Sequence, residues 1–292
     1  PVVSGPMPSR QKSLAPSSRY LTGGPADLYF ELSSMSELLQ VLQLLPKTCP
    51  IHVVGLGSNT LFRDGGFEGA VMKLVGDFKQ CSLDGVSVIA GGGCSNRQLA
   101  RLAAVGAVSG LEFLDGVPGT VGASARMNAG AFGSDVGAIC VEVKVVDRSG
   151  SCYTLNASEI SFGYRETDLP PDGIVTEVLL KGVESSTNTV LSAMKLMNAQ
   201  RRTYQPVLAR TCGSSFKNPP GQSARRVIAD AGLASSRVGG AKLSDMNANF
   251  MIAQPGCKSS DLETLGEYLR CEVRRGMNIE LNWEICIVGR HE

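Results

Sequence analysis

The sequence predicts an α+β chain built from two parts, and three observations support this. Apolar strands followed by glycine-rich turns occur twice before residue 110, alternating strand patterns continue to about residue 182, and helical spacing begins near residue 185. At 292 residues the chain also exceeds the roughly 150 residues of a typical domain. We therefore expect one domain over 20–182 and a second over 183–292.

The first part begins with a helix marked by a capping box, because Ser34 precedes Glu37 by three positions. A short apolar strand then enters the glycine turn "GLGSN", and "VSVIAGGGCSNRQLARLAAVGA" repeats strand, turn and helix. The stretch 110–135 is so rich in Gly and Ala that we expect a long ordered loop. A hairpin over 141–155 and a strand over 173–182 complete this part.

The second part is expected to hold three helices and a final strand. The first helix ends before Pro206, the second covers 223–231, and the third covers 260–275 between a Ser260/Glu263 capping box and Gly276. The strand "IELNWEICIV" (279–288) alternates strictly, which places Glu284 on the face opposite the apolar residues.

Composition excludes several classes of protein. The net charge is +1 and no basic block occurs, which argues against nucleic acid as a partner. No apolar run is long enough to span a bilayer. The nine cysteines are scattered singly and only two histidines occur, so we expect no disulfide framework, no metal site and a reducing cytoplasm. Residues 1–19 lack an apolar core and are expected to form a loose leader rather than a signal peptide.

Two glycine-rich stretches are candidates for holding a pyrophosphate. In "GLGSN", Gly55 and Gly57 allow backbone amides to approach phosphate, and Ser58 and Asn59 add polar groups. Thr60 replaces the third glycine of a dinucleotide-binding fingerprint, so a Rossmann site is not supported, and a plain tight turn is the alternative.

The second stretch is "GVPGTVGA" (116–123), followed by "MNAGAFG". Its candidate residues are Gly116, Gly119, Thr120, Gly122, Ala123 and Asn128. A pyrophosphate bridging both loops would gain many N–H contacts without needing a positively charged chain. The alternative is a structural loop that demands glycine conformations.

Four further residues each have a structural explanation as well as a functional one. Arg165 could pair with the neighbouring Glu166, and Glu284 could be a solvated strand carboxylate. Ser214 and Ser215 could bond their own turn, and with two histidines a Ser-His-Asp triad is not expected. If a serine acts, proton transfer is its credible role.

Together these stretches resemble the UDP-N-acetylenolpyruvoylglucosamine reductase (MurB) family. The resemblance spans the chain through "TGGPADLYF", "VVGLGSNTLFRDGGFEGAV", "LEFLDGVPGTVGASARMNAGAFG", "FGYRET", "CGSSFKNPPG" and "LNWEICIVG". It implies noncovalent FAD in a two-part domain of the vanillyl-alcohol-oxidase (PCMH) type, with a C-terminal α/β substrate-binding domain. The short link after "FKNPPG" is similar to the type II branch, which lacks a tyrosine-bearing insertion.

The resemblance also implies a reaction and roles for site residues. NADPH reduces the flavin, and UDP-N-acetylglucosamine enolpyruvate then takes its place in the same pocket. Arg165 and Glu284 match the family residues that address the substrate carboxylate, and Ser214 matches the proton-donating serine. Ser215 falls where the family varies.

Substrate contacts are implied for Tyr164, Lys217, Asn218 and Asn247. Asn247 stands where relatives often have His or Gln, and Tyr204 stands where many have Lys, which removes a positive charge from the diphosphate site. Two alternatives remain, an oxidase with covalently bound flavin and a nucleotide-sugar sensor without turnover. We expect a monomer, although the sequence does not fix the oligomeric state.

Overall fold

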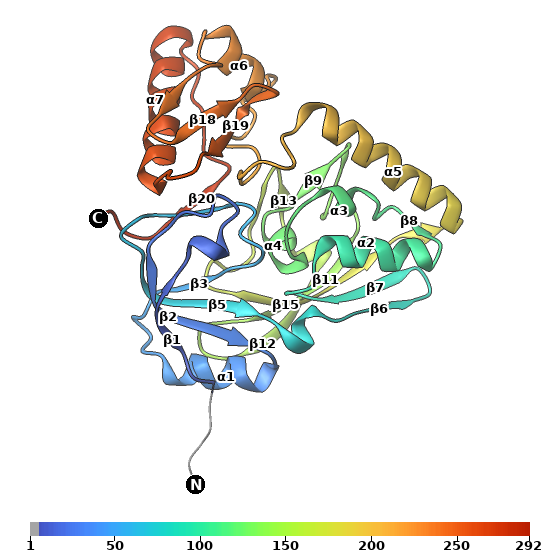
Figure 1. The fold of residues 1–292 in the computed structure, drawn as a ribbon. Coiled ribbons are helices and arrows are strands. Elements are labelled where there is room, and N and C mark those ends of the chain that lie inside the picture. The colour runs from blue at the N-terminus through green and yellow to red at the C-terminus, as the bar shows by residue number, and fades with distance from the viewer. Residues whose placement is uncertain (1–5) are drawn as a thin grey trace. The chain divides into compact units, whose positions relative to one another are not determined.

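The computed structural model describes residues 6–292, which divide by residue contacts into two compact units (Figure 1). The first unit comprises the described residues up to Ser9 together with 28–56 and 69–200. The second comprises 10–27, 57–68 and 201–292. The domain boundary at 182/183 stays a prediction from sequence pattern, because contacts assign residues on both sides of it to the first unit.

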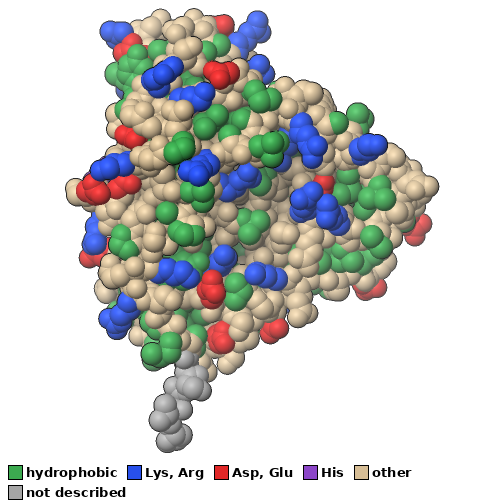
Figure 2. Space-filling model, in the orientation of Figure 1, with side chains coloured by type: hydrophobic (Ala, Val, Ile, Leu, Met, Phe, Trp, Pro, Cys, Tyr) green, Lys and Arg blue, Asp and Glu red, His purple; other side chains and the backbone are tan. Residues whose placement is uncertain are grey.

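Charged side chains do not form one continuous block on the visible surface. Lys and Arg side chains occur at many separate places on the face drawn in Figure 2, with apolar and uncharged atoms between them. Across residues 6–292, no helix combines the length and the apolar character needed to cross a membrane.

The first unit contains a five-stranded antiparallel sheet of order β12-β11-β15-β7-β6. Its strands are β6 (Cys81–Asp84), β7 (Ser87–Gly91), β11 (Cys140–Val146), β12 (Cys152–Asn156) and β15 (Ile174–Lys181). The expected hairpin is β11 and β12, and the strand expected to follow it is β15, so both predictions are confirmed.

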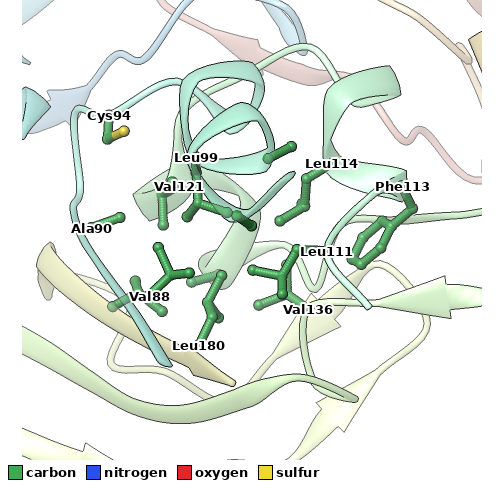
Figure 3. Packing of buried hydrophobic residues seen from close by; sticks show 14 of the residues in the cluster. Val88, Ala90, Cys94, Leu99, Leu111, Phe113, Leu114, Val121, Val136 and Leu180 are labelled. Carbon is green, nitrogen blue, oxygen red and sulfur yellow. The ribbon is translucent and has the colours of Figure 1, made fainter. Parts of the chain in front are cut away.

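Helices α2 (Asn96–Val105), α3 (Phe113–Gly116) and α4 (Val121–Arg126) belong to the same core as this sheet (Figure 3). Leu99 and Leu114 from the helices join Val88 and Leu180 from the strands, and all four are at most 1% exposed. Burying each such side chain contributes about 1.5–3 kcal/mol. The expected strand, turn and helix over 86–107 are confirmed as β7 and α2.

A four-stranded sheet has the order β1-β2-β5-β3, with β1 (Ser9–Ser13), β2 (Pro25–Leu32), β3 (Ile51–Val53) and β5 (Phe67–Leu74). Helix α1 (Met35–Leu44) buries Leu38 in a cluster with Leu32 and Met72. Its predicted cap is confirmed in part, because the Ser34 hydroxyl accepts from the Glu37 amide at 3.3 Å. The Glu37 carboxylate accepts from the amide and the hydroxyl of Ser33, the residue before the cap, at 2.6 and 2.7 Å.

The second unit has its own core, formed by the sheet β17-β18-β19 with helices α6 (Ala224–Asp230) and α7 (Ser259–Met277). The strands are β17 (Arg237–Val238), β18 (Ala241–Ser244) and β19 (Asn247–Ala253). A separate parallel pair joins β4 (Thr60–Phe62) to β20 (Cys286–Val288). Tyr20 and Leu61, from two distant segments, are fully buried in this same core.

The remaining elements are short apart from one helix. They are η1 (Ala15–Ser17), η2 (Gly76–Lys79), η3 (Ala157–Glu159), the long helix α5 (Thr187–Tyr204), and the two-stranded pairs β8 (Val108–Ser109) with β16 (Val183–Glu184), β9 (Gly130–Ala131) with β10 (Ser134–Asp135), and β13 (Phe162–Gly163) with β14 (Glu166–Thr167).

Both predicted ends of the third helix, α7, are wrong. It begins at Ser259, and the Asp64 carboxylate accepts from the amides of Ser259 and Ser260 at 2.9 and 2.8 Å. Glu263 is therefore not part of a capping box and pairs with Arg63 at 2.7 Å. The helix ends at Met277, and Asn278 directly after it adopts φ 53° and takes the left-handed role expected of Gly276.

Three other expectations differ from the structure. The leader is not loose from Ser9 onward, because β1 pairs in a sheet and Leu14 is fully buried, while residues 1–5 lie outside the described part. The stretch 110–135 holds the short helices α3 and α4, because its few large apolar residues are buried. The final strand was expected over 279–288 but covers only β20. Leu281 and Ile285 are nevertheless buried, as the alternation predicted.

Candidate active site

The two glycine-rich loops meet in the first unit. Gly55 follows β3, and a Cβ atom placed on it would lie 2.7 Å from Oγ1 of Thr120, the residue that precedes α4. That distance is shorter than real Cβ contacts, so the close approach requires glycine at position 55. Gly122 is similarly tight, because its Cβ would lie 2.9 Å from the carbonyl oxygen of Gly92. Main-chain groups of both loops are thereby brought to one place.

A buried asparagine that sequence reasoning missed holds the second loop. Asn96 is fully buried, and its Nδ2 donates to the carbonyl oxygen of Val117 at 3.0 Å and to the hydroxyl of Ser124 at 2.7 Å. Its backbone amide donates to the carbonyl of Gly119 at 3.1 Å. A polar residue in the first turn of a helix resembles a surface residue, so no local signal distinguishes Asn96.

Asn128 lies at the end of the same loop and uses its amide within the protein. Its Nδ2 donates to the carbonyl of Gly163 and its Oδ1 accepts from the amide of Gly137, both at 2.8 Å. The residue is 2% exposed and its backbone is left-handed, with φ 42°. Asn128 thus fixes its loop to the β13 strand, and its predicted contact with a cofactor stays a prediction.

Arg165 lies at the tip of the hairpin that joins β13 to β14. Its φ of 61° is in the left-handed region, which costs a residue other than glycine about 1–2 kcal/mol. Its Nη2 donates to the carbonyl of Gly130 at 2.9 Å, and its guanidinium carbon lies 5.2 Å from the centre of the Tyr164 ring. Tyr164 is 51% exposed, so this hairpin presents an aromatic ring and a cation together.

In the second unit, the residues after Leu56 lie beside the final strand. Gly57 has φ 61°, and a Cβ atom there would lie 1.9 Å from the carbonyl oxygen of Ser17. Asn59 donates from Nδ2 to the carbonyl of Glu284 at 2.8 Å, and its own carbonyl accepts from Cys286 at 2.9 Å. Ser58 and Asn59 are both partly exposed. The predicted polar residues of the first loop therefore adjoin the segment that carries Glu284, directly before β20.

The two serines differ in burial, as expected of neighbours in an extended segment. Ser215 is fully buried, and its hydroxyl accepts from the amide of Met251 at 3.3 Å. Ser214 is partly exposed, as is Glu284. The Glu284 amide donates to the carbonyl of Ser215 at 2.9 Å, so the structure brings the main chain of the serine segment and that of Glu284 together.

The predicted substrate residues of this unit also have structural contacts. The Asn218 Oδ1 accepts from the amide of Ala224 at 3.0 Å at the start of α6. Asn247 donates from Nδ2 to the carbonyl of Tyr204 at 3.4 Å. Lys217 is partly exposed, and its amide donates to the carbonyl of Asn282 at 2.8 Å. Their substrate contacts remain predictions.

Two buried ionisable groups lie near the serine segment. Burial raises the pKa of the Tyr20 hydroxyl well above its usual range and also raises the pKa of the Cys212 thiol. Both groups are therefore neutral at pH 7, and Cys212 is not an activated nucleophile. The Cys212 Sγ lies 3.6 Å from the Ser18 hydroxyl and 3.4 Å from the carbonyl of Thr60.

Residues 26–156 match the protein-family profile described as an FAD binding domain, which confirms the predicted fold class. The residues present fit this cofactor, because two glycine loops meet where main-chain groups from both can approach one pyrophosphate. The fold and site define a flavoprotein oxidoreductase.

Residues 205–288 match the profile of the C-terminal domain of UDP-N-acetylenolpyruvoylglucosamine reductase. The chain is 39% identical over 279 residues to the reductase of that name from Nitrobacter winogradskyi, covering 95% of this chain and 92% of the relative. It is also 39% identical to the reductase of Rickettsia prowazekii, covering 93% and 92%. The chain belongs to the UDP-N-acetylenolpyruvoylglucosamine reductase family, whose role lies in peptidoglycan synthesis.

Solved structures agree with this assignment. The crystal structure of the Thermus caldophilus reductase (MurB) superposes with a TM-score of 0.83 and 32% sequence identity. The superposition covers 94% of this chain and 97% of the other.

Proposed function

We propose that this chain reduces UDP-N-acetylglucosamine enolpyruvate to UDP-N-acetylmuramate, with noncovalently bound FAD and NADPH as the reductant. The observation that carries the proposal is the hydrogen bond from the Glu284 amide to the Ser215 carbonyl, which joins the backbone of Glu284 to the segment that contains the partly exposed Ser214. Family membership supplies the substrate class. The nine free thiols support a reducing cytoplasm as the place of action.

The glycine loops and their buried asparagine would hold the cofactor. Gly55, Gly119 and Thr120 would offer main-chain amides to the pyrophosphate, whereas the Gly122 amide donates to the carbonyl of Gly92 at 3.0 Å and Asn96 fixes the second loop. Bound FAD supplies the hydride, which it takes from NADPH.

Arg165 and Glu284 would act on the substrate carboxylate. Hydride addition to the terminal enol carbon places an electron pair on the neighbouring carbon, and the charge spreads into the carboxylate. A guanidinium stabilises that charge through paired N–H donors. Glu284 would polarise the same carboxylate as a protonated acid.

Ser214 would complete the reaction by donating the proton of its hydroxyl to the carbon that carries the electron pair. Solvent then returns a proton to the serine. Its partial exposure supports this role, whereas the buried Ser215 hydroxyl is already an acceptor for Met251.

The test combines an absorption spectrum with turnover. The purified protein should be yellow, and acid precipitation should release all flavin into the supernatant. NADPH oxidation should depend on the enolpyruvyl substrate. Flavin retained in the pellet would favour a covalent oxidase, and substrate binding without NADPH oxidation would favour a nucleotide-sugar sensor.

A further inference from the structure

We infer that Asn249 is a positioning residue for Ser214, and this inference rests on the proposed function. Asn249 lies in β19 and is 5% exposed. Its Oδ1 accepts from the amide of Phe216 at 3.0 Å, and its Nδ2 donates to the carbonyl of the same residue at 2.8 Å. Its own carbonyl accepts from the amide of Ser215 at 2.7 Å. One asparagine therefore binds the main chain of the two residues that directly follow Ser214.

The opposite edge of this segment is bound as well. The Ser215 carbonyl accepts from Glu284, and the Lys217 amide donates to the carbonyl of Asn282. The rings of Phe216 and Trp283 lie 4.9 Å apart between their centres. Residues 215–217 are thus hydrogen-bonded to residues 282–284 on one side, through the bridge between Phe216 and Trp283, and to Asn249 of β19 on the other. Ser214 directly precedes this fixed segment.

Asparagine is the suitable side chain for this task. Phe216 presents one amide donor and one carbonyl acceptor, and a side-chain amide satisfies both at once. A carboxylate lacks the donor, and alanine lacks both groups. The backbone amide of Asn249 in turn donates to Oδ1 of Asn247 at 3.0 Å, which helps to fix the main chain of Asn249.

The hydrogen bonds of Asn249 matter for the reaction because proton donation requires the Ser214 hydroxyl to lie within hydrogen-bond reach of the substrate carbon that receives the proton. The hydrogen bond from the Glu284 amide to the Ser215 carbonyl also fixes the backbone of Ser214 relative to that of Glu284, whose carboxyl group would bind the same substrate. A displacement of about 1 Å caused by a distant mutation costs on the order of 100-fold in rate. Asn249 therefore acts on the second half-reaction through Ser214.

The experiment is a double-mutant cycle read by stopped-flow on the flavin-loaded protein. In Asn249→Ala, reoxidation by UDP-N-acetylglucosamine enolpyruvate should slow on the order of 10–100-fold, as for other residues that support a site from behind. Reduction by NADPH should change less than about twofold. In a Ser214→Ala background the same substitution should have almost no further effect, because the two residues act as one unit.

The control is Val273→Ala, which removes apolar atoms from α7 and leaves every hydrogen bond of residues 214–217 in place. It should lower the melting temperature without slowing reoxidation. A second readout needs no turnover, because hydrogen exchange of the peptide containing Ser215 and Phe216 should accelerate in Asn249→Ala and not in the control.

Several outcomes would overturn the inference while leaving the proposed function intact. These are full additivity of Asn249→Ala and Ser214→Ala, an equal loss in both half-reactions, or unchanged exchange at residues 215 and 216. If Asn249→Ala does not fold, Asn249→Asp keeps the size and the acceptor but lacks the donor, and it enters the same cycle. If the unaltered protein is not reoxidised by the substrate, the proposed function itself fails.

Discussion

The guanidinium of Arg165 donates to the backbone carbonyl of Gly130 at 2.9 Å while the backbone of Arg165 itself is left-handed. The side chain is thus held at the tip of a two-residue hairpin connection in a conformation that favours glycine. Such strain persists where the surrounding structure enforces it, and it is concentrated at functional sites.

Replacement of Arg165 should separate stability from activity. Arg165→Gly relieves the left-handed backbone, so the free energy of unfolding should fall by less than for Arg165→Ala, which keeps the strain, with a difference of about 1 kcal/mol. Both variants should be reduced normally by NADPH and reoxidised slowly by the substrate. Denaturant unfolding and stopped-flow traces measure the two effects, and normal reoxidation in either variant would remove Arg165 from the proposed mechanism.

The two serines should respond differently to the same substitution. Ser214→Ala should slow substrate-driven reoxidation on the order of 10²–10⁴-fold, because a general acid is lost, while flavin content is unchanged. Ser215→Ala should lower stability by about 1–3 kcal/mol, because the buried Met251 amide loses its acceptor. Single-turnover rates and melting curves of both variants decide between them. A larger rate defect in Ser215→Ala than in Ser214→Ala would show that Ser214 is not the proton donor.

The contact between the glycine loops should determine flavin affinity. In Gly55→Ala the new Cβ would lie 2.7 Å from the Thr120 hydroxyl oxygen, so the loops must separate and FAD should bind at least about tenfold more weakly. Adding Thr120→Ala removes the colliding atoms and should restore part of the affinity.

A matched control for this variant is Gly276→Ala on α7, where nothing lies within 4 Å of the new Cβ. It should leave flavin binding unchanged and increase stability by about 0.5–1 kcal/mol. Titration of the flavin-free proteins with FAD measures the affinity for FAD of Gly55→Ala, of its double variant with Thr120→Ala, and of Gly276→Ala. Undiminished affinity in Gly55→Ala would show that the loops need not touch to hold the cofactor.

His52 should make stability depend on pH. Burial lowers the pKa of His52 to about 4, whereas the unfolded chain has the ordinary value near 6.5. Below pH 6.5 the unfolded state binds a proton that the folded state does not, so folded stability decreases as the pH falls from 6.5 to 4, by at most about 3 kcal/mol. His52→Gln should flatten this part of the profile. Denaturant unfolding of both proteins at several pH values checks it, and identical slopes would contradict the expected shift.

The sequence predicted elements whose signals are local. Ser34 caps α1 from the adjacent position, and the hairpin of β11 and β12 follows from alternation around a polar turn. The predicted start of α7 was wrong because Asp64, which binds its first amides, comes from a segment far away in the chain, and because the local carboxylate that binds the Lys258 amide belongs to Asp261 and not to Glu263. Residues 110–135 were expected to be a loop because glycine and alanine outnumber the few large side chains that the tertiary structure buries.

The residues of the candidate site likewise divide into those with local signals in the sequence and those whose partners lie far away in the chain. Glycine turns and the serine pair are visible in the sequence, since their conformations depend on neighbouring residues. The roles of Asn96 and Asn249 are not visible, because each side chain bonds backbone groups at least 20 positions away and nothing beside it in the sequence indicates those partners.

The composition of the second unit has a consequence for the order of events during synthesis. Residues 10–27 and 57–68 leave the ribosome before residues 69–200 of the first unit, whereas their partners in the second unit, residues 201–292, leave after them. Tyr20 and Leu61 therefore stay without their core neighbours while the intervening chain is made, for roughly ten seconds or longer at 5–20 residues per second. The nascent chain exposes apolar surface during this interval, and the second unit can close only after residues 201–292 have emerged.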